Sequence, residues 1–95
     1  MTKEEALSAL YCLRQGEEYP YDASDAWNDT VDDAAAPPAE DWAHNAARGI
    51  IANLRDRRGI KRGFDNVDED VRQDVVAAIR HIILLAHTPA LIGGE

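Results

Sequence analysis

Apolar residues recur every three or four positions along most of the chain, and this spacing predicts helices. Three of them share one helical face near the N-terminus: Leu7, Leu10 and Tyr11. Thr2 and Glu5 stand three residues apart, the spacing of a capping box, and Gly16 is a typical helix stop. We therefore predict a first helix over about residues 3–15.

The next segment predicts a short second helix. Ser24 is a suitable N-cap, and Pro37 and Pro38 must lie beyond its end, since proline disfavours helical geometry in the preceding residue. Its apolar positions follow at four-residue steps: Trp27, Val31 and Ala35.

A third helix is predicted over about residues 38–58, with Pro38 in its first turn and the acidic Glu40 and Asp41 near the positive end of its dipole. Its apolar side chains form a main stripe and a second stripe beside it, namely Trp42, Ala46, Ile50 and Leu54, then Ala43, Ala47 and Ile51. Gly59 followed by Ile60 fits a left-handed cap.

The last helix is predicted over residues 69–87, with Asp68 as its cap and Glu69 and Asp70 in its first turn. Its main stripe is expected to face the core and contains Val71, Val75, Ala78, Ile79, Ile82 and Ala86. Three more apolar residues lie off this stripe: Val76, Ile83 and Leu84. Either this helix runs through the centre of the fold, or the extra apolar surface mediates self-association into a homo-oligomer.

No period-two pattern of useful length appears, so we predict an all-α fold, a bundle of three to four helices. The 95 residues suit one domain, and 45% hydrophobic residues is a globular composition. The single Cys12 excludes an internal disulfide, and the longest apolar run is too short to cross a bilayer. These features favour a cytoplasmic protein without membrane insertion.

Charge divides the chain into two parts. The first 41 residues hold 11 acidic and 2 basic residues, whereas the remainder holds 7 acidic and 8 basic ones. Direct binding of duplex nucleic acid is therefore disfavoured, because the acidic part repels phosphate.

Half of the ten basic residues nevertheless cluster in NLRDRRGIKRGF: Arg55, Arg57, Arg58, Lys61 and Arg62. Arg48 is seven residues before Arg55 and extends the same helical side. Guanidinium groups suit bidentate contact with phosphate. The candidate aromatic platforms for a base are Tyr11, Tyr19, Tyr21, Trp27, Trp42 and Phe64. The alternative is that the cluster compensates the helix dipole and pairs with neighbouring carboxylates.

The acidic segment suggests a different function. Its carboxylates imitate nucleic-acid charge and would bind a basic groove on a host protein, with these candidate contacts: Asp25, Asp29, Asp32 and Asp33. Catalytic and metal-binding motifs are not evident, because the three histidines show no i, i+4 pair and no phosphate-loop motif occurs. We therefore expect no enzymatic activity and no cofactor.

The stretch AARGIIANLRDRRGIK followed by DEDVRQDVV resembles small uncharacterised helical proteins of phages and prophages. The resemblance covers about residues 46–83 and implies no activity or functional residue. It implies only a setting, in which such proteins act by stoichiometric binding in the host cytoplasm. Three hypotheses follow: a counter-defence protein that sequesters a nucleotide signal, an acidic inhibitor of a host defence complex, and a structural oligomeric accessory protein.

Overall fold

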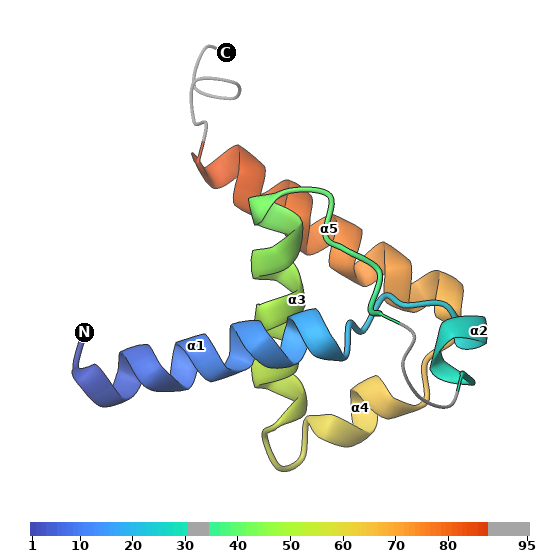
Figure 1. Ribbon diagram of the computed structural model, residues 1–95, viewed down its shortest axis with the longest axis horizontal. Helices are drawn as coiled ribbons and strands as arrows, with labels where there is room; N and C mark the ends of the chain where they lie inside the picture. The colour runs from blue at the N-terminus through green and yellow to red at the C-terminus, as the bar shows by residue number, and fades with distance from the viewer. Residues whose placement is uncertain (31–34, 88–95) are drawn as a thin grey trace.

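The computed structural model describes residues 1–30 and 35–87, which form helices joined by turns and loops, without a strand (Figure 1). The all-α fold is therefore confirmed. The helices are α1 (Lys3–Glu18), α2 (Asp25–Asn28), α3 (Trp42–Arg55), α4 (Lys61–Asp65) and α5 (Glu69–His87).

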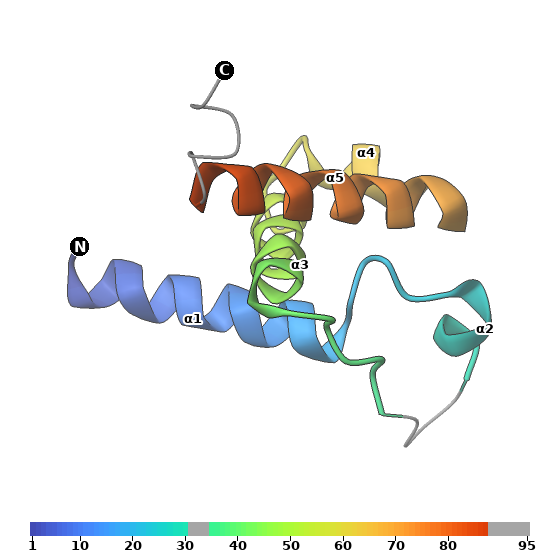
Figure 2. The same cartoon turned by 90° about the horizontal axis from the view of Figure 1, so that it is seen from above.

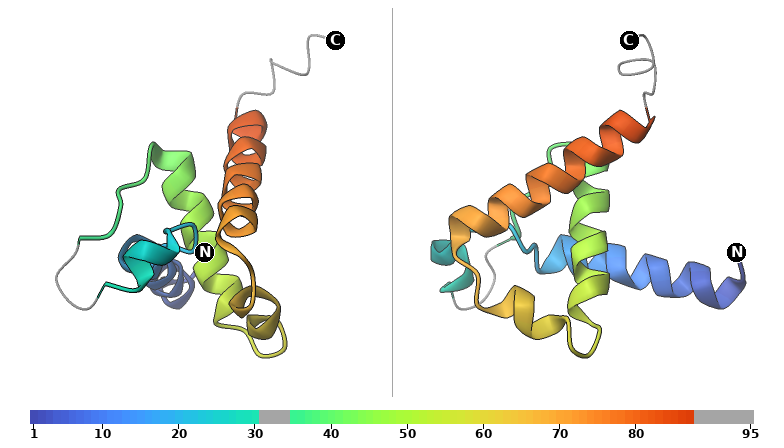
Figure 3. Two further views of the ribbon diagram at one scale, coloured as in Figure 1. Left: turned by 90° about the vertical axis from the view of Figure 1, so that its right-hand side faces the viewer. Right: turned by 180° about the vertical axis from the view of Figure 1, so that it is seen from behind.

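Helix α3 is the centre of the arrangement. It contacts α1, α4 and α5, and Figure 2 shows it nearly end-on between α1 on one side and α5 on the other. The two further views show that the N-terminal half of α1 extends past α3 (Figure 3). In keeping with this, residues 1–11 are all exposed.

The crossing of α1 and α3 depends on two glycines. Gly16 was expected to end the first helix, but α1 continues through it to Glu18. A Cβ atom at Gly16 would lie 2.7 Å from the carbonyl carbon of Arg48, and one at Gly49 would lie 2.9 Å from a methyl carbon of Leu13. Gly16 therefore marks a close contact of two backbones rather than a helix stop.

Helices α1 and α2 begin at the capping residues that the sequence predicts. The capping box of Thr2 and Glu5 is present, and the Ser24 side chain accepts a hydrogen bond from the Trp27 N–H. The predicted second helix is too long, because α2 ends at Asn28 and Ala35 is not helical; the predicted position Val31 lies outside the described residues.

The predicted bounds of α3 were wrong at both ends. The helix begins after Asp41, whose carboxylate accepts the His44 N–H at 2.8 Å, and it ends at Arg55. Asp41 has extended backbone geometry, so the helix cannot include the prolines before it. Gly59 has the expected left-handed conformation, with φ of 83°. The chain then forms α4, a short helix that the pattern did not predict.

The core is small and uses different stripes from those predicted. Its buried cluster comprises Tyr21, Ala47, Ile51 and Val76, against which Phe64, Val75, Ile79 and Ile83 pack. On α3 the second stripe is buried, whereas Trp42 and Ile50 are 55% and 42% exposed. Small alanines on this second stripe let α5 approach α3 closely, which places the larger residues outside.

The prediction for α5 was also wrong in part. Val76 and Ile83, which lie off the predicted stripe, pack in the core. Val71 and Ile82, which belong to that stripe, are 47% and 66% exposed. The helix is therefore rotated about its axis relative to the sequence-based expectation. No described helix is long and apolar enough to cross a membrane.

Replacing Gly16 with Ala should destabilise the fold by about 1–3 kcal/mol, because the added methyl group meets the backbone of α3. Gly63→Ala in α4 is the matched control, since nothing lies within 4 Å of its Cβ position. Helix propensity alone favours alanine by about 1 kcal/mol at both sites. Equal effects of the two substitutions in urea denaturation would contradict the close crossing.

Candidate functional site

A partly buried carboxylate attaches the loop between α1 and α3 to the central helix. Asp22 lies between His44 and Arg48, which are one turn apart on α3. Arg48 Nε donates to Asp22 Oδ1 at 2.8 Å, and His44 Nε2 is 2.7 Å from Asp22 Oδ2. Arg48 is 4% exposed and also donates to the Pro37 carbonyl at 2.7 Å, so both ends of the loop are attached to α3.

The hydrogen bonds of His44 define its tautomer. Its Nδ1 accepts the Glu40 N–H at 2.9 Å, so in the neutral ring Nε2 carries the proton and donates to Asp22. Burial of Asp22 opposes its ionisation, but the hydrogen bonds from Arg48 and His44 outweigh this effect and lower its pKa. The cluster is thus a satisfied network that holds the loop in place.

A second ion pair joins α5 to the start of α3. Arg80 donates through Nε and Nη2 to both carboxylate oxygens of Asp41, the N-cap of α3. The Arg80 hydrogen bonds and the His44 N–H lower the pKa of Asp41 to about 2. Asp41 therefore stabilises the fold in its ionised form.

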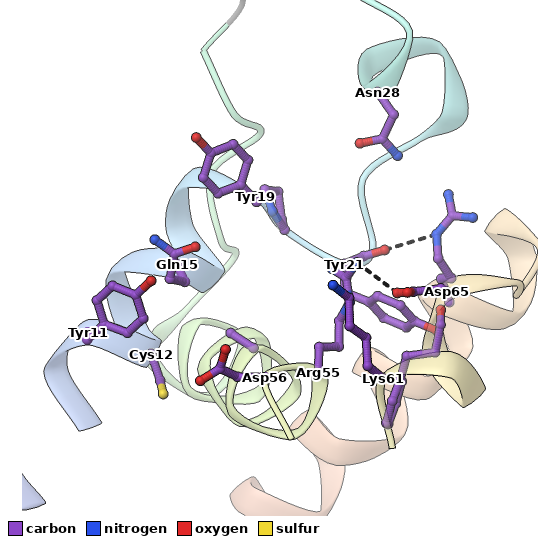
Figure 4. Close-up of a pocket in the computed structure, with 14 residues that line it drawn as sticks. Tyr11, Cys12, Gln15, Tyr19, Tyr21, Asn28, Arg55, Asp56, Lys61 and Asp65 are labelled. Atoms are coloured by element: carbon purple, nitrogen blue, oxygen red, sulfur yellow. Dashed lines mark hydrogen bonds and ion pairs between the residues drawn. The ribbon is translucent and has the colours of Figure 1, made fainter. Parts of the chain in front are cut away.

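An open pocket of about 540 Å³ lies where α1, the following loop, the C-terminal end of α3 and α4 meet (Figure 4). Its lining is mostly aromatic and charged: Tyr11, Cys12, Gln15, Tyr19, Pro20, Tyr21, Asn28, Ala52, Arg55, Asp56, Lys61, Phe64, Asp65 and Arg72.

One wall of the pocket comes from a single face of α1. Tyr11, Gln15 and Tyr19 are spaced by four residues and therefore lie along one side of the helix and its C-cap. Tyr11 is 57% exposed and Tyr19 is 63% exposed, so both rings present their surfaces to solvent.

Tyr21 forms the inner part of the pocket. Its hydroxyl donates to the Phe64 carbonyl at 2.9 Å, and the two rings meet edge to face with centroids 5.5 Å apart. The Arg55 guanidinium lies 5.3 Å from the centre of the Tyr21 ring, within the range of a cation–π contact. Burial raises the pKa of the Tyr21 hydroxyl, which stays protonated at neutral pH.

The three cations of the pocket differ in how firmly they are held. Arg72 donates to the carbonyls of Tyr21, Val67 and Ala23 and to the Asp25 carboxylate. Arg55 has a single 3.3 Å contact with Asp65, and its buried Nε has no hydrogen-bond partner. The Lys61 backbone N–H donates to the Arg57 carbonyl, but its side chain has no hydrogen bond or ion pair to another described residue.

The sequence-predicted basic cluster does not stay together. Arg55, Lys61 and Tyr11 line the pocket, whereas Arg57, Arg58 and Arg62 are exposed and do not line it; Arg57 donates to Asn53 instead. The chain leaves the helix after Arg55 and turns at Gly59, which separates these side chains. Arg48 shares the helical side of Arg55 but is buried against Asp22, so the structure does not present it as a ligand contact.

The predicted acidic contacts are only partly described. Asp25 pairs with Arg72 at 2.7 Å, and Asp29 is exposed. Asp32 and Asp33 lie outside the described residues. Across residues 1–30 and 35–87, no three His, Cys, Asp or Glu side chains are grouped so that they could hold a metal ion.

Comparisons with protein-family models, with curated proteins and with solved structures found no match.

Replacing Asp22 with Ala should cost about 3–5 kcal/mol of unfolding free energy, because it leaves the Arg48 charge buried without its carboxylate. Asp29→Ala in the same segment is the matched control and should change stability by less than about 0.5 kcal/mol, as exposed sites usually do. Chemical denaturation followed by circular dichroism measures both. A small effect at Asp22 would show that the loop is not attached through this pair.

The Asp41 ion pair should make stability depend on pH in the acidic range. The pKa of Asp41 is lower in the folded protein than the value of about 3.9 expected for the unfolded chain. Its contribution is therefore complete above that value and is lost as the pH falls toward about 2. Asp41→Asn keeps a capping side chain but lacks the charge. The difference in melting temperature between the two proteins should shrink from pH 5 to pH 2, and a constant difference would contradict this assignment.

Proposed function

We propose that this chain is a non-catalytic binding module for a small ligand that combines a phosphate group with an aromatic ring, of which a nucleotide is the simplest case. The ligand would occupy the pocket between α1, α3 and α4. The observation that supports this proposal is the placement of two weakly held cations, Arg55 and Lys61, in one pocket with the exposed rings of Tyr11 and Tyr19.

The hydrogen bonds of the arginines indicate which of them a ligand can recruit. Arg48 and Arg80 each donate three hydrogen bonds, which a ligand would have to replace. Arg55 has only one long hydrogen bond to give up, with the exposed carboxylate of Asp65, and such pairs contribute about 0–1 kcal/mol; its other contact is with the face of the Tyr21 ring.

Exchanging the Asp65 contact for a phosphate would be favourable for Arg55. A hydrogen bond to a charged group contributes about 1.5–3 kcal/mol, and turning Arg55 toward a phosphate would also give its unpaired Nε a partner. The gain thus exceeds the loss of the Asp65 contact.

The pocket also has the size and lining expected for this ligand class. Its volume of about 540 Å³ falls within the usual range for small-molecule sites. A base stacked on Tyr11 or Tyr19 would gain about 1–3 kcal/mol, and the amide of Gln15 lies between these rings along α1, where it would meet the base edge.

The resemblance to small phage proteins suggests the biological role. Stoichiometric capture of a host nucleotide signal in the cytoplasm, as a counter-defence measure, is the form of the proposal that fits a binding module without catalytic groups. The competing proposal, an acidic mimic of nucleic acid, has less support, because the carboxylate of Asp25 is already paired with Arg72.

Calorimetric titration with nucleoside monophosphates and cyclic dinucleotides tests the proposal. At least one probe should bind, and Lys61→Ala should weaken its affinity about tenfold, the equivalent of about 1.4 kcal/mol. Arg62→Ala is the matched control, since it removes the same charge from the neighbouring residue, which does not line the pocket.

Two results would contradict the proposal. One is the absence of binding by every probe at millimolar concentration. The other is an equal loss of affinity in both variants, which would indicate general electrostatic attraction to this end of the molecule rather than a pocket.

A further inference from the structure

Helix α5 carries an apolar stripe that is exposed at four of its five positions. Five residues spaced alternately by four and three positions form it: Val71, Val75, Ala78, Ile82 and Leu85. Val71, Ile82 and Leu85 are 47%, 66% and 41% exposed, and Val75 alone is half-buried at the edge of the core. This spacing is that of the seam between two helices of a coiled coil.

We propose that this α5 stripe (residues 71, 75, 78, 82 and 85) is a homodimer interface, in which α5 of a second copy packs antiparallel to it. The inference is independent of the proposed ligand, because no residue of the stripe lines the pocket.

The charges beside the stripe indicate the direction of packing. Asp74 and His81 flank it on the side away from the core and are seven residues, or two helical turns, apart. In an antiparallel pair, Asp74 of each copy lies opposite His81 of the other, which gives two hydrogen-bonded or charged contacts across the two-fold axis. In a parallel pair Asp74 meets Asp74 at one level and His81 meets His81 at another, so no opposite charges meet.

The apolar side chains fit an antiparallel register close to this one. In the antiparallel register in which Val71 faces Ile82 and Val75 faces Ala78 of the second copy, Asp74 lies two residues, about 3 Å along the helix axis, from the level of His81 of that copy, so the two side chains can still meet. The valine at position 75 is thus matched by a small residue, which lets the two helix backbones approach closely at the centre. The stripe and the charges beside it are thus complementary to themselves in the antiparallel arrangement. Such self-complementarity favours a second copy of this chain over an unrelated partner.

The rest of each molecule leaves room for this packing. The core-facing residues of α5 are Val76, Ile79 and Ile83, and their mean direction is roughly a third of a turn from the stripe at 3.6 residues per turn. The two bodies therefore diverge from the α5 pair instead of colliding.

The small core gives a reason for dimerisation. Among the described residues, Ile51 and Val76 are the largest side chains that are fully buried, while several larger apolar side chains remain in solvent. Burial of the α5 stripe against its own copy would extend the apolar interior across the two-fold axis.

Light scattering after size-exclusion chromatography tests the interface. The wild-type chain should have the mass of a dimer, and Ile82→Glu should reduce it to a monomer with unchanged helical content. Ile50→Glu on α3 is the control, because Ile50 is likewise an exposed isoleucine, at 42%, but lies outside the stripe. A monomeric wild-type chain, or a dimer that survives Ile82→Glu, would overturn the proposal.

Disulfide cross-linking tests the antiparallel register. The double variant Val71→Cys with Ile82→Cys should form covalent dimers on mild oxidation, whereas Val71→Cys alone should not. Within one helix these positions are about 16 Å apart at 1.5 Å per residue, so they cannot bond to each other in the same chain. Efficient cross-linking of Val71→Cys alone would indicate a parallel pair and overturn the proposed arrangement.

Discussion

The structure depends first on the partly buried carboxylate of Asp22. It compensates the charge of Arg48 inside the molecule and accepts from His44, so it joins an irregular loop to the central helix. Without it, Arg48 would lie in the interior with only the Pro37 carbonyl as acceptor. The neighbouring Tyr21 enters the core from the same loop, and its ring becomes the inner part of the pocket. The fold and the candidate site therefore share one electrostatic anchor.

The basic residues serve two different purposes. Arg48, Arg72 and Arg80 act as structural ties, each with three or more hydrogen bonds that connect elements distant in sequence. Arg55 and Lys61 are held weakly and face a pocket with exposed tyrosine rings. The structural arginines pair with Asp22, Asp25 and Asp41, whereas the two weakly held cations share their pocket with Asp56 and Asp65.

Sequence periodicity predicted the helical class and the long helices, because capping residues and apolar spacing act locally. Thr2 and Ser24 gave correct start signals for this reason, whereas Gly59 lies four residues beyond the end of α3 and does not cap it. The faces that α3 and α5 turn toward the core could not be predicted from local sequence. Both helices carry apolar residues on more than one face, and which face is buried depends on how closely the helix backbones approach each other. Gly16 illustrates the difficulty, because the local sequence does not distinguish a glycine that ends a helix from a glycine that allows a second helix to pack closely.

The candidate site was predictable only in part. Arg55, Lys61, Tyr11 and Tyr19 were candidates from charge clustering and aromatic content, whereas Gln15 was missed, although its four-residue spacing from both tyrosines could have identified it. Asp22 and His44 gave no sequence signal, because their pairing spans 22 residues and arises only when the loop folds back.

The most direct test of the central claim, that the pocket binds a phosphate-bearing aromatic ligand, is a nuclear magnetic resonance titration of the ¹⁵N-labelled protein with a nucleotide. The account predicts concentration-dependent shifts at the amides of Gln15, Arg55 and Lys61. Shifts confined to Arg57, Arg58 and Arg62, or no shifts at all, would contradict it.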